Sequence, residues 1–506
     1  MKLRSIIKLL VLALIVSAGS IQIASGQQAP FQGFDDYINN AMKAWDVPGM
    51  AIAVVKDDKV VYAKGYGLRE IGKTAAVGEN TIFAIGSSSK AFTSASIALL
   101  ADEGKLKWDD PVTKYLPGFQ LFDPYVTRQM TVRDMLTHRI GLERGDQLWY
   151  ATAYSREEVL RRVRFLEPSS SVRSRFGYQN IMYLAAGEMV PSITKTSWDN
   201  FVAERIFTPL GMKNSGTSIK TLSRSDDVST PHVKIDGKME PVAWRLIDNI
   251  GPAGSINSNV TDMAQWVRLH LAKGKFNGKQ LISEAAIKEM HTPQTIMRIE
   301  GQYPIIYADA HFLNYGMGWF LSDFRGKKLV EHGGAIDGMR ALVAMIPEEN
   351  VGLVILTNAN GTILPQFLAY RIFDSYLGKD PKDWQAEALP KIKAIEEQGR
   401  AAQEKALADR VKGTSPSLNL EKYAGTYQSD MYGDVEIRFA GGKLSQHFGP
   451  NFNGDIEHWN YDTFQVTWRD KVQGKGFITF SLNAKGAVDV VDLGGMGKFK
   501  RQPEKK

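Results

Sequence analysis

The sequence predicts a mixed α/β (α+β) fold, in which a central antiparallel sheet is flanked by helices and a helical lobe, followed by a small all-β domain. Three observations support this prediction. Hairpin patterns lie near both ends of the first ~380 residues, the segment between them is mostly helical in pattern, and short polar–apolar alternations begin after position 416.

The two hairpin patterns define the predicted sheet. Apolar runs at 50–55 and 60–65 flank one polar turn, and runs at 341–346 and 351–357 flank another. If the four strands join one sheet, His332 is carried on the edge of that sheet.

The remaining segments complete the predicted organisation. Residues 90–290 supply the helical lobe, and the charged, Ala- and Glu-rich stretch 385–412 predicts a linker helix. Residues 418–502 alternate polar and apolar positions with many Gly and aromatic residues, which is typical of a small barrel or sandwich. We therefore predict a signal peptide at 1–26, the main domain at 27–384, a helical linker at 385–415 and a barrel-like β-domain at 416–506.

The N-terminus has the pattern of a secretory signal. The basic start Lys2 to Lys8 precedes the apolar stretch Leu9 to Ala18, and Ala24-Ser25-Gly26 forms a cleavage site of small residues. An uncleaved anchor is the alternative, but the apolar part is shorter than the ~20 residues of a spanning helix. We expect a periplasmic or secreted protein of bacterial type.

Composition excludes several classes of protein. The 506 residues, 43% hydrophobic and 23% charged, suit a soluble protein with one large and one small domain. The absence of Cys excludes disulfides and thiolate catalysis. A formal charge of +7, to which the leader contributes, is too mild to indicate nucleic acid or an anionic membrane as partner. No His-Glu-x-x-His or similar cluster predicts a metal, and no cofactor is indicated.

The strongest chemical signal is Ser87, followed three residues later by Lys90. Both precede a run, Ala91 to Glu103, that is apolar on nearly every side and therefore predicts a buried helix ending at Gly104. The N-terminus of a helix carries unpaired N–H groups and stabilises negative charge. Burial and the helix dipole favour a neutral amine on Lys90, and such an amine activates a neighbouring hydroxyl.

The spacing Ser-x-x-Lys alone is weak, because it recurs at Ser5–Lys8 and at Ser192–Lys195. The first copy lies in the predicted leader, and the second lies in a polar stretch with no apolar run behind it. Only Ser87 has the context of a buried helix.

Two further motifs supply what acyl transfer needs besides a nucleophile. In Tyr178-Gln179-Asn180, Tyr178 can carry a proton and the Asn180 amide can bind a substrate amide. In His332-Gly333-Gly334, the glycines allow a substrate backbone to approach a strand and its N–H groups. Similar patterns at Tyr37 and His447 do not fit one fold with Ser87, because Tyr37 lies before the nucleophile and His447 lies in the separate terminal domain.

These three motifs, in this order, resemble the serine β-lactamase and penicillin-binding protein superfamily, in its class C β-lactamase, DD-peptidase and esterase branch. Phrases such as Val47-Pro48-Gly49-Met50 and Tyr315-Gly316-Met317-Gly318-Trp319 add to a resemblance that covers about residues 30 to 380. The resemblance implies a β-lactamase/transpeptidase-like serine hydrolase domain. Residues 416–506 resemble the lipocalin-like β-domain often appended to this family.

The resemblance also implies roles for individual residues. Ser87 is the nucleophile, and Lys90 and Tyr178 move protons. The oxyanion hole is formed by backbone N–H groups of Ser87 and Ala335. The substrate-binding residues that the resemblance implies are Asn180, His332, Gly334 and Ala335.

The third motif departs from the β-lactamase pattern, because His332 and Gly333 stand where Lys and Thr are usual. A histidine, with a reference pKa of ~6.5, is mostly neutral at pH 7, so the site lacks a fixed cation to hold a penicillin carboxylate. His-x-Gly resembles DD-peptidases, D-aminopeptidases and esterases. We therefore expect hydrolysis of D-amino-acid-containing peptides or small esters.

Two alternatives remain: a class C-like β-lactamase, and a catalytically idle binding or sensor protein of the same fold. The expected partner is a small-molecule or peptide substrate. The oligomeric state and the role of the β-domain stay open.

Overall fold

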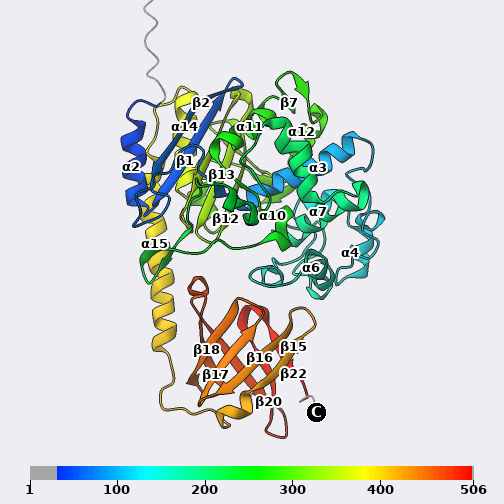
Figure 1. Ribbon diagram of the computed structural model, residues 1–506, viewed down its shortest axis with the longest axis vertical. Helices are drawn as coiled ribbons and strands as arrows, with labels where there is room; N and C mark the ends of the chain where they lie inside the picture. Colours follow the sequence, from blue (N-terminus) through cyan, green and yellow to red (C-terminus); the bar gives the residue numbers. More distant parts are fainter. Residues whose placement is uncertain (1–30, 504–506) are drawn as a thin grey trace, which may run out of the picture. The chain divides into compact units, whose positions relative to one another are not determined.

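The computed structural model describes residues 31–503, so the predicted signal peptide lies outside the described residues. An eight-stranded antiparallel sheet, in the order β2-β1-β14-β13-β12-β11-β10-β9, is its largest element (Figure 1). The strands of this sheet are β1 (Gly49–Lys56), β2 (Lys59–Gly67), β9 (Thr295–Met297), β10 (Leu313–Tyr315), β11 (Phe320–Phe324), β12 (Lys327–Ile336), β13 (Met339–Ile346) and β14 (Val351–Thr357).

Both predicted hairpins are confirmed. β1 pairs with β2, and β13 pairs with β14, each antiparallel. β1 also pairs with β14, with Ala53 opposite Val354, so segments 300 residues apart form the centre of one sheet. The β14 strand is buried along its whole length.

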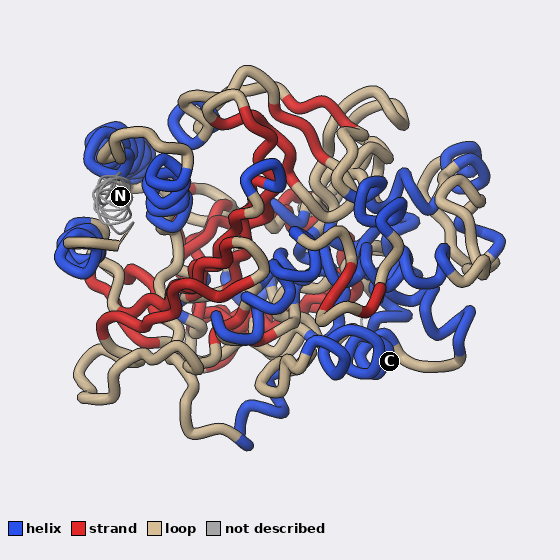
Figure 2. Tube along the Cα trace, turned by 90° about the horizontal axis from the view of Figure 1, so that it is seen from above, coloured by secondary structure: helices blue, strands red, loops and turns tan. Residues whose placement is uncertain are grey.

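Helices cover the sheet on both sides, which explains why β1, β13 and β14 are apolar at most positions (Figure 2). The helix α11 (Val260–Leu271) contacts β1 and β14, where Val267 lies in the same core cluster as Val354 and Leu356. The helix α14 (Leu364–Tyr376) contacts β13 and β14.

His332 does not lie on an edge strand, which corrects the prediction. β12 lies between β11 and β13, and the pair Phe320–Glu331 is the last one on the β11 side. β11 has 5 residues and β12 has 10, so β11 ends halfway along its neighbour. From His332 to Ile336, β12 therefore pairs with β13 alone.

The predicted buried helix is confirmed as α3 (Ser89–Asp102), which is buried from Ser89 to Leu100. It packs against α7 (Asn180–Thr194) and the short α10 (Gly251–Gly254). The other α-helices are α2 (Phe34–Ala44), α4 (Pro124–Gln129), α5 (Val132–Leu136), α6 (Arg156–Arg162), α8 (Trp198–Val202), α9 (Thr208–Leu210), α12 (Glu284–Met290), α13 (Tyr303–Ile306) and α15 (Trp384–Ala408).

Three two-stranded sheets complete the main domain. One of them pairs β3 with β6, and β3 directly precedes the turn that carries Ser87. Their strands are β3 (Phe83–Ala84), β4 (His232–Ile235), β5 (Lys238–Pro241), β6 (Asn257–Ser258), β7 (Lys275–Phe276) and β8 (Lys279–Gln280).

The C-terminal strands close into an eight-stranded barrel, drawn in orange and red in Figure 1. Alternate residues of β16, such as Val435 and Ile437, point into its core, as the polar–apolar alternation predicts. The barrel strands are β15 (Gly425–Ser429), β16 (Gly433–Ala440), β17 (Lys443–Phe448), β18 (Phe452–Asn460), β19 (Thr463–Trp468), β20 (Lys475–Leu482), β21 (Val488–Asp492) and β22 (Lys498–Arg501). The predicted fold class, with its small barrel-like domain, is confirmed.

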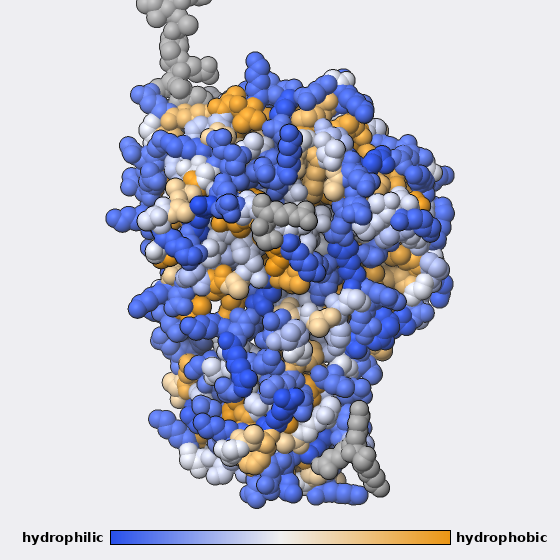
Figure 3. Space-filling model, viewed as in Figure 1, coloured by the Kyte–Doolittle hydropathy of each residue, from blue (hydrophilic) through white to orange (hydrophobic). Residues whose placement is uncertain are grey.

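The surface is mixed in polarity. Figure 3 shows hydrophilic side chains over most of one face, with apolar side chains in scattered groups. Within residues 31–503, no helix combines the length and the apolar character that a membrane span requires.

Candidate active site

Ser87 lies in a 3₁₀ turn, Gly86–Ser88, immediately before α3. Lys90 lies in the first turn of that helix, and its amine is fully buried. The Nζ atom lies 3.2 Å from Ser87 Oγ, 2.7 Å from Asn180 Oδ1 and 2.9 Å from the backbone O of Ala253. A neutral amine can donate to Asn180 and Ala253 and still accept the Ser87 hydroxyl proton.

The surroundings of Lys90 favour this neutral form. Burial lowers the pKa of the Lys90 amine well below its ordinary value of 10.5, and the positive charge of Arg144 lowers it further, against an opposing effect of Asp146. The amine is therefore suited to act as a base toward Ser87, as the sequence predicts.

Tyr178 precedes α7 and faces the same amine. Lys90 Nζ lies 4.8 Å from the centre of the Tyr178 ring, and the Arg144 guanidinium lies 5.0 Å from it. Burial raises the pKa of the Tyr178 phenol above its ordinary value of 10.0, against opposing effects of a hydrogen bond to Ser87 and the charge of Arg144. The phenol is therefore a proton donor near neutral pH.

The Tyr178 loop is held by His138. The backbone N–H of Gln179 donates to His138 Nδ1 over 3.1 Å, and the His138 and Tyr178 rings lie 4.3 Å apart. The Gln179 side chain caps α7 by accepting from Ile181 N. His138 thus orients Tyr178 from behind.

Asn180 uses both ends of its amide. Its Oδ1 accepts from Lys90, and its Nδ2 donates to Asp146 Oδ1 over 2.8 Å. Asp146 in turn accepts from Trp149 Nε1 and from Arg144 Nε. The second N–H of Asn180 Nδ2 remains for a substrate carbonyl.

Two glycines let β12 approach the nucleophile turn. A Cβ on Gly334 would lie 1.8 Å from the backbone O of Ile85, and one on Gly86 would lie 2.6 Å from the backbone N of Ala335. Gly86 also has a φ of +50°, which L side chains rarely adopt. The backbones of Ser87 and Ala335 therefore come together, as the implied oxyanion hole requires.

His332 is almost fully buried beside this backbone, since its exposure is 1%. Its Nδ1 faces the carbonyl of Gly333 at 2.6 Å, so Nδ1 carries the proton, and Nε2 accepts from the Tyr315 hydroxyl at 3.0 Å. Burial lowers the pKa of His332 to about 3. The ring is neutral, and its hydrogen bond with Tyr315 links β12 to β10.

Two cavities meet at Ser87. One, of about 260 Å³, is lined by Asn180, Tyr150 and Asp337. The other, of about 320 Å³, is lined by Tyr178 and Arg340. Both are bordered by Ala335 of β12. A substrate that reaches Ser87 can therefore extend to either side of it.

The barrel holds side chains of the wall of the first cavity in place through hydrogen bonds. Arg245 donates to Asp337 over 2.7 Å and to Asp470 of the barrel over 2.6 Å. The Tyr150 hydroxyl donates to Asp337 and accepts from Gln473 of the barrel. The segment between β19 and β20 thus supports two side chains beside the site.

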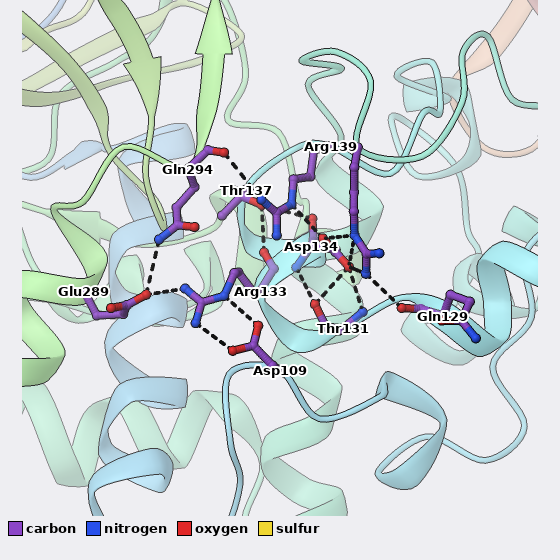
Figure 4. Close-up of polar contacts among 10 residues, drawn as sticks. Asp109, Gln129, Thr131, Arg133, Asp134, Thr137, Arg139, Glu289 and Gln294 are labelled. Carbon is purple, nitrogen blue, oxygen red and sulfur yellow. Dashed lines mark hydrogen bonds and ion pairs between the residues drawn. The ribbon is translucent and has the colours of Figure 1, made fainter.

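A polar network fixes the segment that ends in His138 (Figure 4). The buried Asp134 carboxylate accepts from Arg139 at 2.6 Å and from Arg173 at 2.6 Å. It also accepts from the Thr131 backbone, which closes a capping box around α5. These hydrogen bonds therefore fix the direction in which the loop leaves the C-terminus of α5.

The predicted residues Ser87, Lys90, Tyr178 and Asn180 thus lie together, with the backbones of Gly334 and Ala335 beside them. Sequence reasoning missed Tyr315, Asp146 and Arg340. Tyr315 lies in a phrase that carried the resemblance, but no spacing rule links it to His332. Within residues 31–503, no group of three or more His, Asp or Glu side chains has the geometry of a metal site.

The comparison with known families agrees with this geometry. A family model described as Beta-lactamase matches residues 34–375, so the chain belongs to that family. Residues 409–503 match a second model, which is described as a domain of unknown function.

Similar proteins include hydrolases and penicillin-binding homologues. The unguisins hydrolase ungD of Aspergillus violaceofuscus is 29% identical over 455 residues, which cover 82% of this chain and 78% of the fungal protein. Protein flp of Staphylococcus aureus (strain MW2) is 24% identical over 346 residues, which cover 67% and 65% of the two chains. The octameric penicillin-binding protein homologue from Pyrococcus abyssi has a TM-score of 0.62 at 23% identity, covers 92% of this chain and 99% of its own, and shares the fold.

Proposed function

We propose that this chain is an exported serine hydrolase that forms an acyl-enzyme at Ser87. Its substrates are amides or esters, foremost peptides that contain D-amino acids, or small esters. The observation that carries the proposal is the contact of the buried Lys90 amine with Ser87 Oγ, at 3.2 Å, in front of the N-terminus of α3.

The acylation step follows from the protonation states. Ser87 Oγ attacks the substrate carbonyl carbon while its proton passes to the lone pair of Lys90 Nζ. The oxyanion accepts from the backbone N–H groups of Ser87 and Ala335. Tyr178 protonates the leaving nitrogen or oxygen as its bond to the carbonyl carbon breaks, and recovers a proton from Lys90.

Deacylation reverses the proton path. A water molecule gives its proton to the Lys90–Tyr178 pair and attacks the acyl carbon, and the proton returns to Ser87 Oγ as the acid leaves. Asn180 binds the acyl-side amide through the free N–H of Nδ2. His332 has no free ring nitrogen, so its role is to orient β12 rather than to bind substrate.

The third motif favours peptide or ester hydrolysis over antibiotic turnover. His332 is neutral and buried, so it supplies no cation for a β-lactam carboxylate. The fungal relative is named as a hydrolase of unguisins, which supports hydrolysis as the class of reaction. A class C-like β-lactamase remains the second candidate, because the family model carries that name.

The test is intact-mass spectrometry after brief exposure of the full-length protein to p-nitrophenyl acetate. We expect one acetyl adduct on the wild type and none on Ser87→Ala. The control is Ser192→Ala, because Ser192 precedes Lys195 with the same spacing but donates to Tyr115 instead. An adduct on Ser87→Ala would contradict Ser87 as the nucleophile, and no adduct on either protein would support the idle binding protein.

Export is tested separately in a bacterial host. The secreted or periplasmic fraction is expected to contain a chain whose N-terminus lies near residue 27. A chain that retains residue 1 and sediments with membranes would support the uncleaved anchor.

A further inference from the structure

Aromatic rings form one wall of the second cavity. Phe176 precedes the Tyr178 motif, Tyr303 begins α13 and Phe320 begins β11, and all three line the cavity of about 320 Å³ that reaches Ser87. Each of the three residues is only partly buried. An aromatic surface, assembled from three separate segments, is therefore open to the cavity.

The rings of this wall are fixed on the side that faces the core. The Phe176 ring lies 5.7 Å from the Tyr315 ring, and the Phe320 ring meets Tyr315 edge to face at 4.9 Å. Tyr303 meets Tyr307 edge to face at 5.8 Å, and Tyr307 and Tyr315 belong to one buried cluster. The wall is thus in place before a ligand arrives, and a preformed wall loses little conformational entropy on binding.

The polar residues of the cavity are compatible with an aromatic ligand. Glu331 and Gln366 are buried, and they are hydrogen-bonded to each other over 2.6 Å. The Arg144 guanidinium already packs on an aromatic ring, since it lies 5.0 Å from the centre of Tyr178. An aromatic ligand therefore need not displace the hydrogen bond between Glu331 and Gln366.

The position of the wall relative to Ser87 decides which part of a substrate it contacts. Asn180, the proposed ligand of the acyl-side amide, lines the first cavity. Tyr178, the proposed proton donor to the leaving group, lines the second cavity together with the aromatic wall. The leaving group therefore extends toward the wall.

We propose that the wall of Phe176, Tyr303 and Phe320 binds an aromatic ring on the leaving group. The enzyme then prefers amides, esters and thioesters whose amine, alcohol or thiol portion carries such a ring. Offset and edge-on packing between rings adds to the burial of apolar surface. This inference rests on the proposed function of Ser87, and it adds the chemical class of the leaving group.

The test compares two thioesters that deliver the same acetyl group to Ser87 and differ in the ring: S-(2-phenylethyl) thioacetate and S-propyl thioacetate. Both leaving thiols are primary alkanethiols, so the two thioesters have similar chemical reactivity. The chain has no Cys, so a thiol reagent reports only the released product. We expect the full-length wild type to prefer the phenylethyl thioester in kcat/KM by about 10- to 100-fold, the range for burial of one aromatic side chain.

Variants assign this preference to the wall. Tyr303→Ala and Phe320→Ala are each expected to lower the ratio by about 3- to 10-fold, the range for loss of one aromatic pair. Tyr303→Phe is expected to retain the ratio, because the ring remains and, within residues 31–503, the Tyr303 hydroxyl has no hydrogen bond to lose. Tyr125→Ala is the remote control, because Tyr125 is 58% exposed on α4 and lines neither cavity.

The outcomes separate this inference from the proposed function. If p-nitrophenyl acetate acylates Ser87 but the wild-type ratio is near one, or both alanine variants keep the wild-type ratio, this inference alone is overturned. If Ser87 is not acylated, the proposed function and this inference fail together. Should both alanine variants unfold, inhibition of the wild type decides. We expect 2-phenylethanol to compete with p-nitrophenyl acetate at about a tenfold lower concentration than propan-1-ol, and equal inhibition by the two alcohols would overturn the inference.

Discussion

At the scale of the residue, Lys90 is the group on which the chemistry depends. Its amine has three contacts, to Ser87, Asn180 and Ala253, and a neutral amine satisfies all of them. Protonation would add a buried charge next to Arg144, although Asp146 would favour that charge. The contact geometry and the electrostatics thus favour the same form of the side chain.

We predict that Lys90→Met lowers the acylation rate of Ser87 by about 10²- to 10⁴-fold, the range for loss of a general base. Stopped-flow release of nitrophenol measures this rate. Lys195→Met is the matched control, because Lys195 follows Ser192 with the same spacing but is exposed and donates to a backbone carbonyl. Equal losses in both variants would contradict the assignment.

The pH dependence of acylation follows from the same contact. The lowered pKa of Lys90 means that the neutral base persists well below pH 10.5, and the wild-type rate should fall only as pH drops through that lowered pKa.

At the scale of the element, the network around Asp134 holds the end of α5 and the loop that follows it (Figure 4). The side chain of Asp134 has no exposed surface, and two arginines and a capping box satisfy it. Burial tends to raise the pKa of Asp134, but the hydrogen bonds from Arg173, Thr131 and Arg139 lower it below 3.8. His138 lies in this loop, and its ring packs against the ring of Tyr178.

We predict that Asp134→Asn lowers the free energy of unfolding by about 1.5–3 kcal/mol, because the hydrogen bonds that the buried carboxylate accepts from Arg139 and Arg173 lose their charged acceptor. Urea unfolding followed by circular dichroism measures the loss. Asp109→Asn is the control: Asp109 also pairs with an arginine, but its side chain is 68% exposed, so a change under about 1 kcal/mol is expected. Similar losses in the two variants would refute the role of burial.

At the scale of the whole molecule, buried neutral histidines connect stability to pH. Burial lowers the pKa of His270 and of His332 to about 3, and lowers those of His138 and His291 below 6.5. His270 and His291 also lie ring on ring, with Nδ1 and Nε2 3.1 Å apart. Protonation of either ring would place a charge inside the core.

We predict that Tm falls as the pH is lowered from 7 to 4. Unfolded histidines bind protons below ~pH 6.5 while the folded ones resist until about pH 3, so protons favour the unfolded chain in this window. Calorimetry at several pH values measures the slope. The double variant His270→Gln, His291→Gln should show a shallower slope, and a slope equal to that of the wild type would contradict the prediction.

The buried acids Glu188 and Asp262 act in the opposite sense. Burial raises the pKa of each carboxyl, so their contribution to stability is lost as pH rises through the raised values. The pKa of a carboxyl such as Asp134 is lowered below 3.8, which is outside the range from pH 7 to 4. Such carboxyls therefore do not change the slope of Tm against pH in this range.

Much of this molecule could be predicted from local pattern. The all-round apolar run after Lys90 predicted α3, two apolar hairpins predicted the centre of the sheet, and alternation after position 416 predicted barrel strands. The four polar residues of the site followed from two short motifs. These predictions succeed because each rests on the periodicity of a single helix or strand. That periodicity can be read from consecutive residues.

The sequence by itself determined the family, the fold class and the residues Ser87, Lys90, Tyr178 and Asn180, because these are properties of consecutive positions. The tertiary structure alone decided that the pairing of β11 with β12 ends at Glu331, that His332 Nε2 accepts from the Tyr315 hydroxyl, and that Arg340 lies beside Gly333. Strand register, side-chain burial and the pairing of charges depend on segments far apart in the chain, and no local pattern encodes which of them meet.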